Sequence, residues 1–124
     1  MKTIDLDFGQ FVFLDDHAIV AAANEGANIG PGHAQKAVEM IEEKLPGDYA
    51  LILDRKADYS VMPLEVYRYF DGLKRLKAIA IVKYKDRDFL PNDMESLLYS
   101  GMVKKFDSIE DAHHWVKTLF NQAC

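Results

Sequence analysis

The spacing of hydrophobic and polar residues changes along the chain, and this change predicts which elements form. Ile4, Leu6 and Phe8 alternate with acidic residues, and a period of two is typical of a half-buried strand. After a two-residue interruption, a second apolar run covers 11–14, and a polar turn separates it from 18–23. We therefore expect an opening hairpin, with 18–23 pairing antiparallel to the run before it.

Two short apolar runs predict the middle of a sheet. They cover 49–53 and 78–82, and such runs are typical of parallel strands that are buried on both faces. Amphipathic helices are predicted between them and before them. One covers 33–45, and the other begins near Pro63 and ends at Gly72. Strands that alternate with helices imply parallel pairing with right-handed crossovers.

The C-terminal part of the chain predicts the remaining elements. A short helix is expected over 91–99, and an edge strand over 103–106. Ser108 opens a last helix, with Asp111 as a weak capping-box partner. The complete pattern predicts one α/β domain over 1–124, a mixed β-sheet with an N-terminal antiparallel hairpin and about four helices packed on it.

Composition narrows the classes of function. The 124 residues carry a formal net charge of −5, which disfavours nucleic acid as a partner because nucleic-acid binders use a basic face to neutralise phosphates. No apolar run approaches the roughly 20 residues of a transmembrane segment, and the N-terminus MKTIDLDFGQ has acids where a signal peptide is apolar. We therefore expect a cytoplasmic protein. The single cysteine, Cys124, cannot form an internal disulfide.

The strongest candidate site is the charged loop between the apolar run 49–53 and the helix that begins near Pro63. In an open α/β sheet, the loop after a strand is where ligands usually bind. Charged loops are also common without any function, and each exposed ion pair is worth about 0–1 kcal/mol. We expect this loop to contact a partner or ligand through Asp54, Arg55, Lys56, Asp58, Tyr59 and Ser60.

Ser60 has two interpretations in this loop. It can be the N-cap of the following helix, where its hydroxyl accepts a hydrogen bond from a free backbone amide. It can also be a phosphorylation site, because a phosphate there would meet the positive end of the helix dipole, with Arg55 or Lys56 as its counter-charge. Both interpretations put the residue at the same place.

Other chemistry-bearing residues form no recognisable catalytic or metal-binding pattern. The glycine-rich segment 28–33 precedes a helix, but it lacks the Gly-Lys-Ser/Thr of a P-loop. His33 has no nucleophile beside it in the sequence, and His113 and His114 are adjacent rather than four apart, so they cannot easily share a metal ion. We assign no catalytic residue, no metal ligand and no cofactor.

The chain resembles a known family in its order of elements and in four stretches, IEEKLPG, YALILDRKADYSVMPLEV, LKAIAIV and IEDAHHWV. These are similar to the short STAS-like proteins, the SpoIIAA-like relatives of the sporulation anti-sigma-factor antagonist. The resemblance implies a sheet with helices on it, used for protein contact or small-ligand sensing. In sporulation-type members a phosphorylatable serine opens the helix after the central strand, inside an Asp-Ser-Ser-Gly motif. Asp58 and Ser60 match that stretch, whereas the Ser-Ser-Gly is absent.

Three functions follow as hypotheses. The first is a non-enzymatic STAS-like interaction or regulatory module with an unknown protein partner, and an exposed hairpin edge that could make a homodimer. The alternative is a small-ligand or lipid-binding domain with a pocket near the 24–33 and 54–60 loops. A small hydrolase using Asp54, His33 or Ser60 ranks last, because the sequence lacks a G-x-S-x-G elbow, a metal-ligand cluster and a dinucleotide fingerprint.

Overall fold

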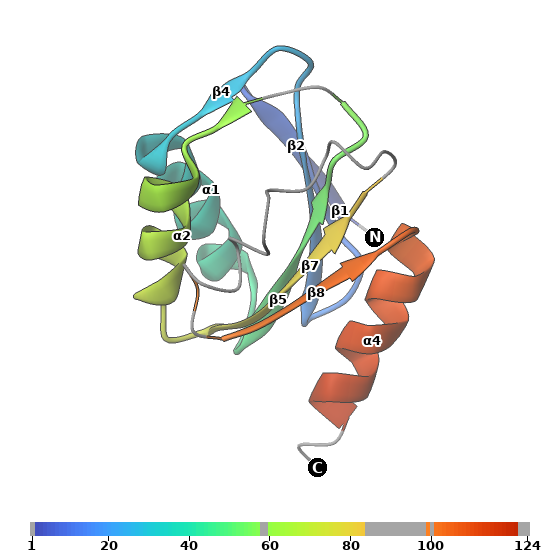
Figure 1. Cartoon of the computed structure of the whole chain (residues 1–124). Helices are drawn as coiled ribbons and strands as arrows, with labels where there is room; N and C mark the ends of the chain where they lie inside the picture. Colours follow the sequence, from blue (N-terminus) through green and yellow to red (C-terminus); the bar gives the residue numbers. More distant parts are fainter. Residues whose placement is uncertain (1, 58–59, 84–98, 100, 122–124) are drawn as a thin grey trace.

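A six-stranded mixed sheet separates two helical layers (Figure 1). The structure is a computed structural model, and it describes residues 2–57, 60–83, 99 and 101–121. The strands follow the order β1-β2-β3-β5-β7-β8 across the sheet. Their bounds are β1 Lys2–Leu6, β2 Gly9–Phe13, β3 Ala18–Ala23, β5 Tyr49–Asp54, β7 Leu76–Val82 and β8 Met102–Phe106.

The direction of pairing divides the sheet into two parts. The first three strands pair antiparallel, so the predicted N-terminal hairpin and its third strand are confirmed. From β3 onward all pairs are parallel, and the predicted strand near the C-terminus forms the edge. Each parallel pair needs a crossover connection. One described helix lies in the crossover from β3 to β5 and another in the crossover from β5 to β7, and most of the connection from β7 to β8 lies outside the described residues.

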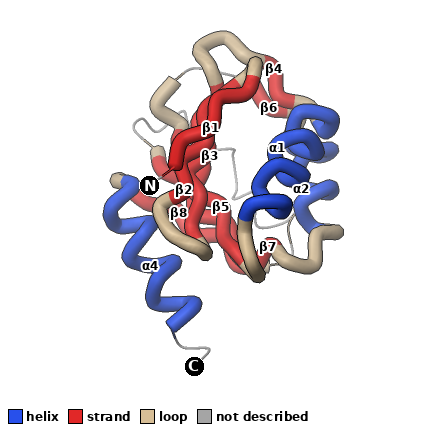
Figure 2. Tube along the Cα trace, turned by 180° about the vertical axis from the view of Figure 1, so that it is seen from behind, coloured by secondary structure: helices blue, strands red, loops and turns tan. Residues whose placement is uncertain are grey.

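Three helices lie in the described part of the chain. Two of them, α1 (Pro31–Lys44) and α2 (Pro63–Asp71), cover one face of the sheet, and α4 (Ile109–Asn121) covers the other (Figures 1 and 2). The sequence predicts about four; the predicted helix over 91–99 lies outside the described residues, Tyr99 excepted. None of the described helices combines the length and apolarity that a membrane crossing needs.

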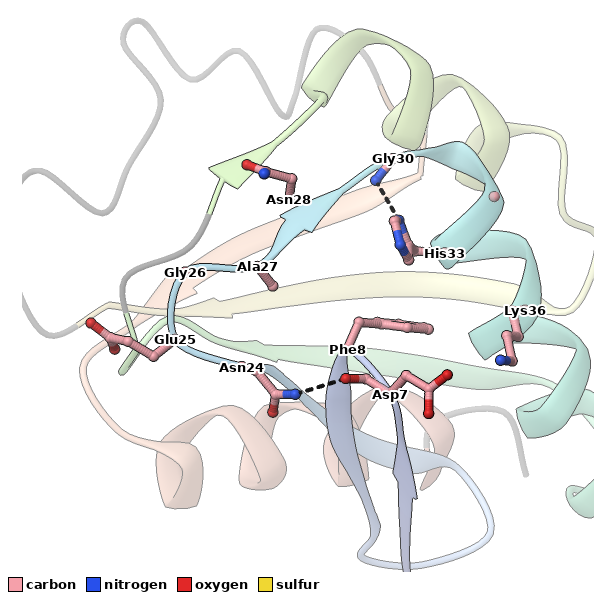
Figure 3. Close-up of a pocket in the computed structure, with 11 residues that line it drawn as sticks. Asp7, Phe8, Asn24, Glu25, Gly26, Ala27, Asn28, Gly30, His33 and Lys36 are labelled. Atoms are coloured by element: carbon pink, nitrogen blue, oxygen red, sulfur yellow. Dashed lines mark hydrogen bonds between the residues drawn. The ribbon is translucent and has the colours of Figure 1, made fainter.

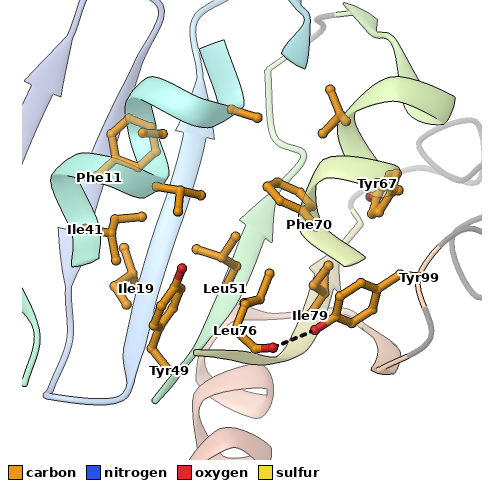
Figure 4. Packing of buried hydrophobic residues seen from close by; sticks show 14 of the residues in the cluster. Phe11, Ile19, Ile41, Tyr49, Leu51, Tyr67, Phe70, Leu76, Ile79 and Tyr99 are labelled. Atoms are coloured by element: carbon orange, nitrogen blue, oxygen red, sulfur yellow. Dashed lines mark hydrogen bonds between the residues drawn. The ribbon is translucent and has the colours of Figure 1, made fainter. Parts of the chain in front are cut away.

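The central strands are buried on both faces, as the apolar runs predict. In β7 the side chains alternate, so that Ile79 and Ile81 pack toward α1 and α2, while Ala78 and Ala80 pack toward α4. All four are 0% exposed. Figure 4 shows the first of these two cores, where Tyr99 donates a hydrogen bond to the backbone oxygen of Leu76 at 3.0 Å. Burial raises the pKa of Tyr99 to about 12.

The first hairpin turn lies earlier than the sequence pattern predicts. Asp7 and Phe8 form the turn, so Phe8 is not part of the strand, whereas Gly9 and Gln10 belong to β2. The physical reason is close packing at Gly9. A Cβ atom there would lie 2.7 Å from the backbone oxygen of Ala22, so only glycine lets β2 pair with β3 at this position.

A second, small sheet forms where the sequence predicts only loops. Its two strands are β4 (Asn28–Ile29) and β6 (Ser60–Val61), and they pair parallel to each other. Strands of two residues are too short to produce a hydrophobic period. This small sheet ties the segment before α1 to the segment before α2.

A polar cluster attaches α4 to the turn between β2 and β3. The Asp15 carboxylate lies 2.7 Å from His113 Nε2 and also accepts the backbone N–H of His17 at 2.7 Å. His17 stacks on Phe120, with ring centroids 4.4 Å apart. Although burial acts to raise the pKa of Asp15, the hydrogen bonds from His113 and His17 outweigh it and lower the pKa below its ordinary value.

Arg75 binds the C-terminal end of α1 to the start of β7. Its guanidinium donates hydrogen bonds of 2.7–3.1 Å to the backbone oxygens of Glu42, Leu45 and Gly47. The Glu42 carboxylate lies 3.8 Å away. The last carbonyls of a helix have no partner within the helix, so Arg75 satisfies them and also complements the negative end of the helix dipole.

We expect Arg75→Met to lower the free energy of unfolding by about 1–3 kcal/mol, because it leaves several part-buried carbonyls without a donor. Urea denaturation followed by circular dichroism measures the change. Lys74→Met is the matched control, since Lys74 is exposed and neighbours Arg75. Equal losses in the two variants would contradict this role of Arg75.

Candidate functional site

The carboxyl ends of β3, β5 and β7 meet the N-terminal ends of α1 and α2 at one edge of the molecule (Figures 1 and 2). The small sheet formed by β4 and β6 lies at the same edge. This is where open α/β sheets usually bind ligands, because the loops there diverge and leave space between the sheet and the helices. Two hollows are found at this edge.

The deeper hollow is a cavity of about 70 Å³, which we call the apolar cavity. Ile29 and Val61 form part of its wall, and they are paired with each other in the small sheet. Arg55 is the only charged side chain among the residues that the structure describes in its lining. The other lining residues come from the β1–β2 turn, from the sheet and from α2: Phe8, Gly9, Phe11, Ala21, Ala22, Ala23, Leu53, Val66, Tyr67 and Phe70.

The second hollow is an open pocket of about 740 Å³ with several charged and polar side chains in its lining, which we call the open pocket (Figure 3). It lies between the β1–β2 turn, the segment after β3 and the start of α1. Asn28 and Gly30 line it, whereas Ile29 between them lines the apolar cavity, as expected from the alternation of a strand. The remaining lining residues are Asp7, Phe8, Asn24, Glu25, Gly26, Ala27, Gly32, His33 and Lys36.

Phe8 separates the two hollows, since it lines both. Its ring makes an edge contact with His33, with centroids 4.9 Å apart, and another with Phe11 at 6.1 Å. His33 is fixed in turn by the backbone N–H of Gly30, which donates to Nδ1 at 3.1 Å. Because Nδ1 is the acceptor, the proton of the neutral ring is on Nε2, and His33 offers one N–H donor.

The predicted contact loop is only partly brought to this site. Asp54 is the last residue of β5, and its carboxylate accepts the backbone N–H of Lys56 at 3.1 Å. Arg55 lines the apolar cavity, and its backbone N–H donates to Val82. Lys56 is exposed. The other predicted contacts, Asp58 and Tyr59, lie outside the described residues.

The interpretation of Ser60 as a helix cap is wrong. Ser60 belongs to β6, and the N-cap of α2 is Met62, which makes no side-chain capping bond. The cause is the pairing of the small sheet, in which Met62 N–H donates to the backbone oxygen of Ile29 at 2.8 Å. This pairing keeps the chain extended through Val61, so the helix begins two residues later than a Ser60 cap requires. Phosphorylation of Ser60 stays a prediction.

The structure places the residues named for a hydrolase differently from one another. Of the three residues named for a hydrolase, His33 lines the open pocket, Asp54 is in the described lining of neither hollow, and the side chain of Ser60 lies outside what the structure describes. Among the described residues no group of three or more His, Cys, Asp or Glu side chains could hold a metal ion. What the site offers is an apolar space beside charged and hydrogen-bonding side chains.

Phe8, Asp7 and Lys36 are site residues that sequence reasoning did not assign to the site. Phe8 continues the alternation of Ile4 and Leu6, so it was interpreted as part of a strand. The glycine-rich segment 28–33 was the available signal, because it pointed to the loop that lines the open pocket. The sequence does not show that Asp7 and Phe8 lie opposite that loop, because this depends on the position of the β1–β2 turn.

We expect Ser60→Ala to cost less stability than Ser108→Ala. Ser108 Oγ accepts the backbone N–H of Asp111 at 3.1 Å and caps α4, and losing such a cap costs about 1 kcal/mol. Ser60 is not at the cap position of α2. Chemical denaturation of both variants measures the two losses, and a larger loss for Ser60→Ala would contradict the assignment of Met62 as the N-cap.

We compared the chain with family models, curated proteins and solved structures. No family model, no curated protein and no solved structure matches the chain. What the site does therefore has to be argued from its own residues.

Proposed function

We propose that this protein is a non-enzymatic binding domain that takes a small, partly apolar ligand between the 24–33 segment and the segment that leads into α2. The observation that carries the proposal is the apolar cavity beside the open pocket, with Phe8 between them. An apolar space next to a few polar groups is the usual composition of a small-molecule site. The STAS-like resemblance supports the same proposal, because it implies small-ligand sensing or protein contact.

The size of the cavity limits what it contributes to binding. Filling about 70 Å³ of apolar space recovers about 1–2 kcal/mol, at roughly 24 cal/mol per Å³. That free energy alone corresponds to a gain in affinity of about tenfold. A ligand of useful affinity therefore also has to contact the polar side chains of the open pocket.

We expect a thermal-shift screen of short-chain alcohols, amines, carboxylates, amino acids and acyl chains to contain compounds that raise the melting temperature. At a concentration of one hundred times its Kd, a ligand adds about 2.7 kcal/mol to the stability of the folded state. Ala21→Leu should abolish the shift, because Ala21 lines the apolar cavity and the larger side chain fills it.

Thr118→Leu is the control for this screen, since it adds the same kind of side chain to an exposed position on α4, on the other face of the sheet. It should keep the ligand-induced shift. The proposal would be contradicted if no compound raised the melting temperature, or if Ala21→Leu kept the same ligand-induced rise.

A second candidate function is a regulatory protein-interaction module of the STAS-like kind. The observation that favours it is a pair of exposed apolar side chains at the start of α2. Met62 is 49% exposed and Leu64 is 47% exposed, directly after the predicted contact loop. Large apolar side chains at such positions are typical of surfaces that contact other proteins.

If this second function holds, a double variant Met62→Ser and Leu64→Ser should lose a partner that the unchanged protein captures from native extract. Met102→Ser is the matched control, because Met102 is 48% exposed but lies on the β8 edge of the sheet. Capture that is equal for the double variant and the control would argue against a partner at α2.

A further inference from the structure

The two sides of the open pocket carry opposite charges. His33 and Lys36 lie on one face of α1, three residues apart, and both line the pocket. Asp7 faces them from the β1–β2 turn, with Phe8 beside it (Figure 3). Among the described residues, no ion pair within 4.0 Å involves either Lys36 or Asp7. An ammonium group and a carboxylate therefore line one open space and lie more than 4.0 Å apart.

The donors on α1 fit a carboxylate. Lys36 has three N–H donors, and His33 has its Nε2–H because Nδ1 accepts from Gly30. Hydrogen bonds between an ionised donor and a carboxylate are about twice as strong as neutral ones. The Asp7 carboxylate on the opposite side is an acceptor only, so it fits an ammonium group.

Besides a carboxylate and an ammonium group, the ligand needs an apolar group, and the apolar cavity limits the size of that group. At about 70 Å³ it has roughly half the volume of the ~150 Å³ cavity that holds a benzene ring. A branched chain of three carbons matches this volume better than an aromatic ring does. The group would enter past Phe8, which borders both hollows.

We propose that the site binds a free α-amino acid with a small aliphatic side chain. Its carboxylate contacts Lys36 and His33, its ammonium group contacts Asp7, and its side chain passes Phe8 into the apolar cavity. This inference rests on the proposed small-ligand function and specifies the ligand class for it. It needs no covalent step and no cofactor.

The test is isothermal titration with four compounds that share one alkyl group. Valine carries both charges, isovalerate lacks the ammonium group, isobutylamine lacks the carboxylate, and isobutanol carries neither charge. Valine should bind at least about tenfold more tightly than each of the other three, because each of them loses a hydrogen-bonded charge. Phenylalanine should bind more weakly than valine, since its ring exceeds the cavity.

Two charge variants locate each contact. Lys36→Gln should weaken both valine and isovalerate, whereas Asp7→Asn should weaken valine and leave isovalerate unchanged. Lys44→Gln is the control, because Lys44 is exposed at the opposite end of α1. Amide chemical shifts of Gly30 and Gly32 on titration would show that the compound occupies the open pocket.

The outcomes separate this inference from the function on which it rests. If all four compounds bind equally, or isobutanol binds most tightly, the amino-acid assignment is overturned and the apolar binding site stands. If none of the four binds, no other amino acid of the thermal-shift screen binds, and a compound of another class does, the ligand class is wrong and the proposed function stands. If no compound binds in either experiment, both are overturned. A preference for valine that disappears in Asp7→Asn supports the assignment.

Discussion

The burial of β5 between β3 and β7 is the constraint on which the rest of the structure depends. Side chains from both faces of these strands are excluded from water, so each face must be covered by helices. Because the pairs are parallel, the chain must cross over after each strand and return to the same edge. The starts of α1 and α2 are therefore brought to the carboxyl ends of the strands, where the candidate site lies.

The two edges of the sheet are used differently. At the amino ends of the parallel strands, long-range polar contacts connect the helices to the sheet. Arg75 donates hydrogen bonds to the end of α1, and Asp15 contacts His113 on α4. His17 adds a third tie there, with its ring nitrogen 2.9 Å from the backbone oxygen of Asp48. At the carboxyl ends, the small sheet joins the two crossover segments but leaves hollows beneath and beside it. This division suits a binding domain, because the polar contacts at the amino ends of the strands hold the helices whose other ends line the hollows.

The proposed function follows from the contrast between the two hollows. The apolar cavity alone is too small to give useful affinity, and the charged side chains of the open pocket are exposed. Phe8 borders both, so a ligand that combines charged groups with a small aliphatic group uses both hollows when its aliphatic group passes the Phe8 ring. The described part of the charged loop after β5 contributes one side chain to the site: Arg55 lines the apolar cavity, whereas the Asp54 carboxylate accepts the backbone N–H of Lys56.

By itself the sequence determined the layered α/β fold, the opening hairpin, the buried central strands and the C-terminal end of α2, because each depends on a local period or on a single Gly. It also predicted that a binding site lies after β5, at the edge of the sheet where the two hollows are found. Only the tertiary structure decided which residues form the site. The turn at Phe8 depends on the close approach of Gly9 to Ala22, and the cap at Met62 depends on a pairing between segments about 30 residues apart. Such contacts join residues that are distant in the sequence, so the local spacing of hydrophobic residues cannot predict them.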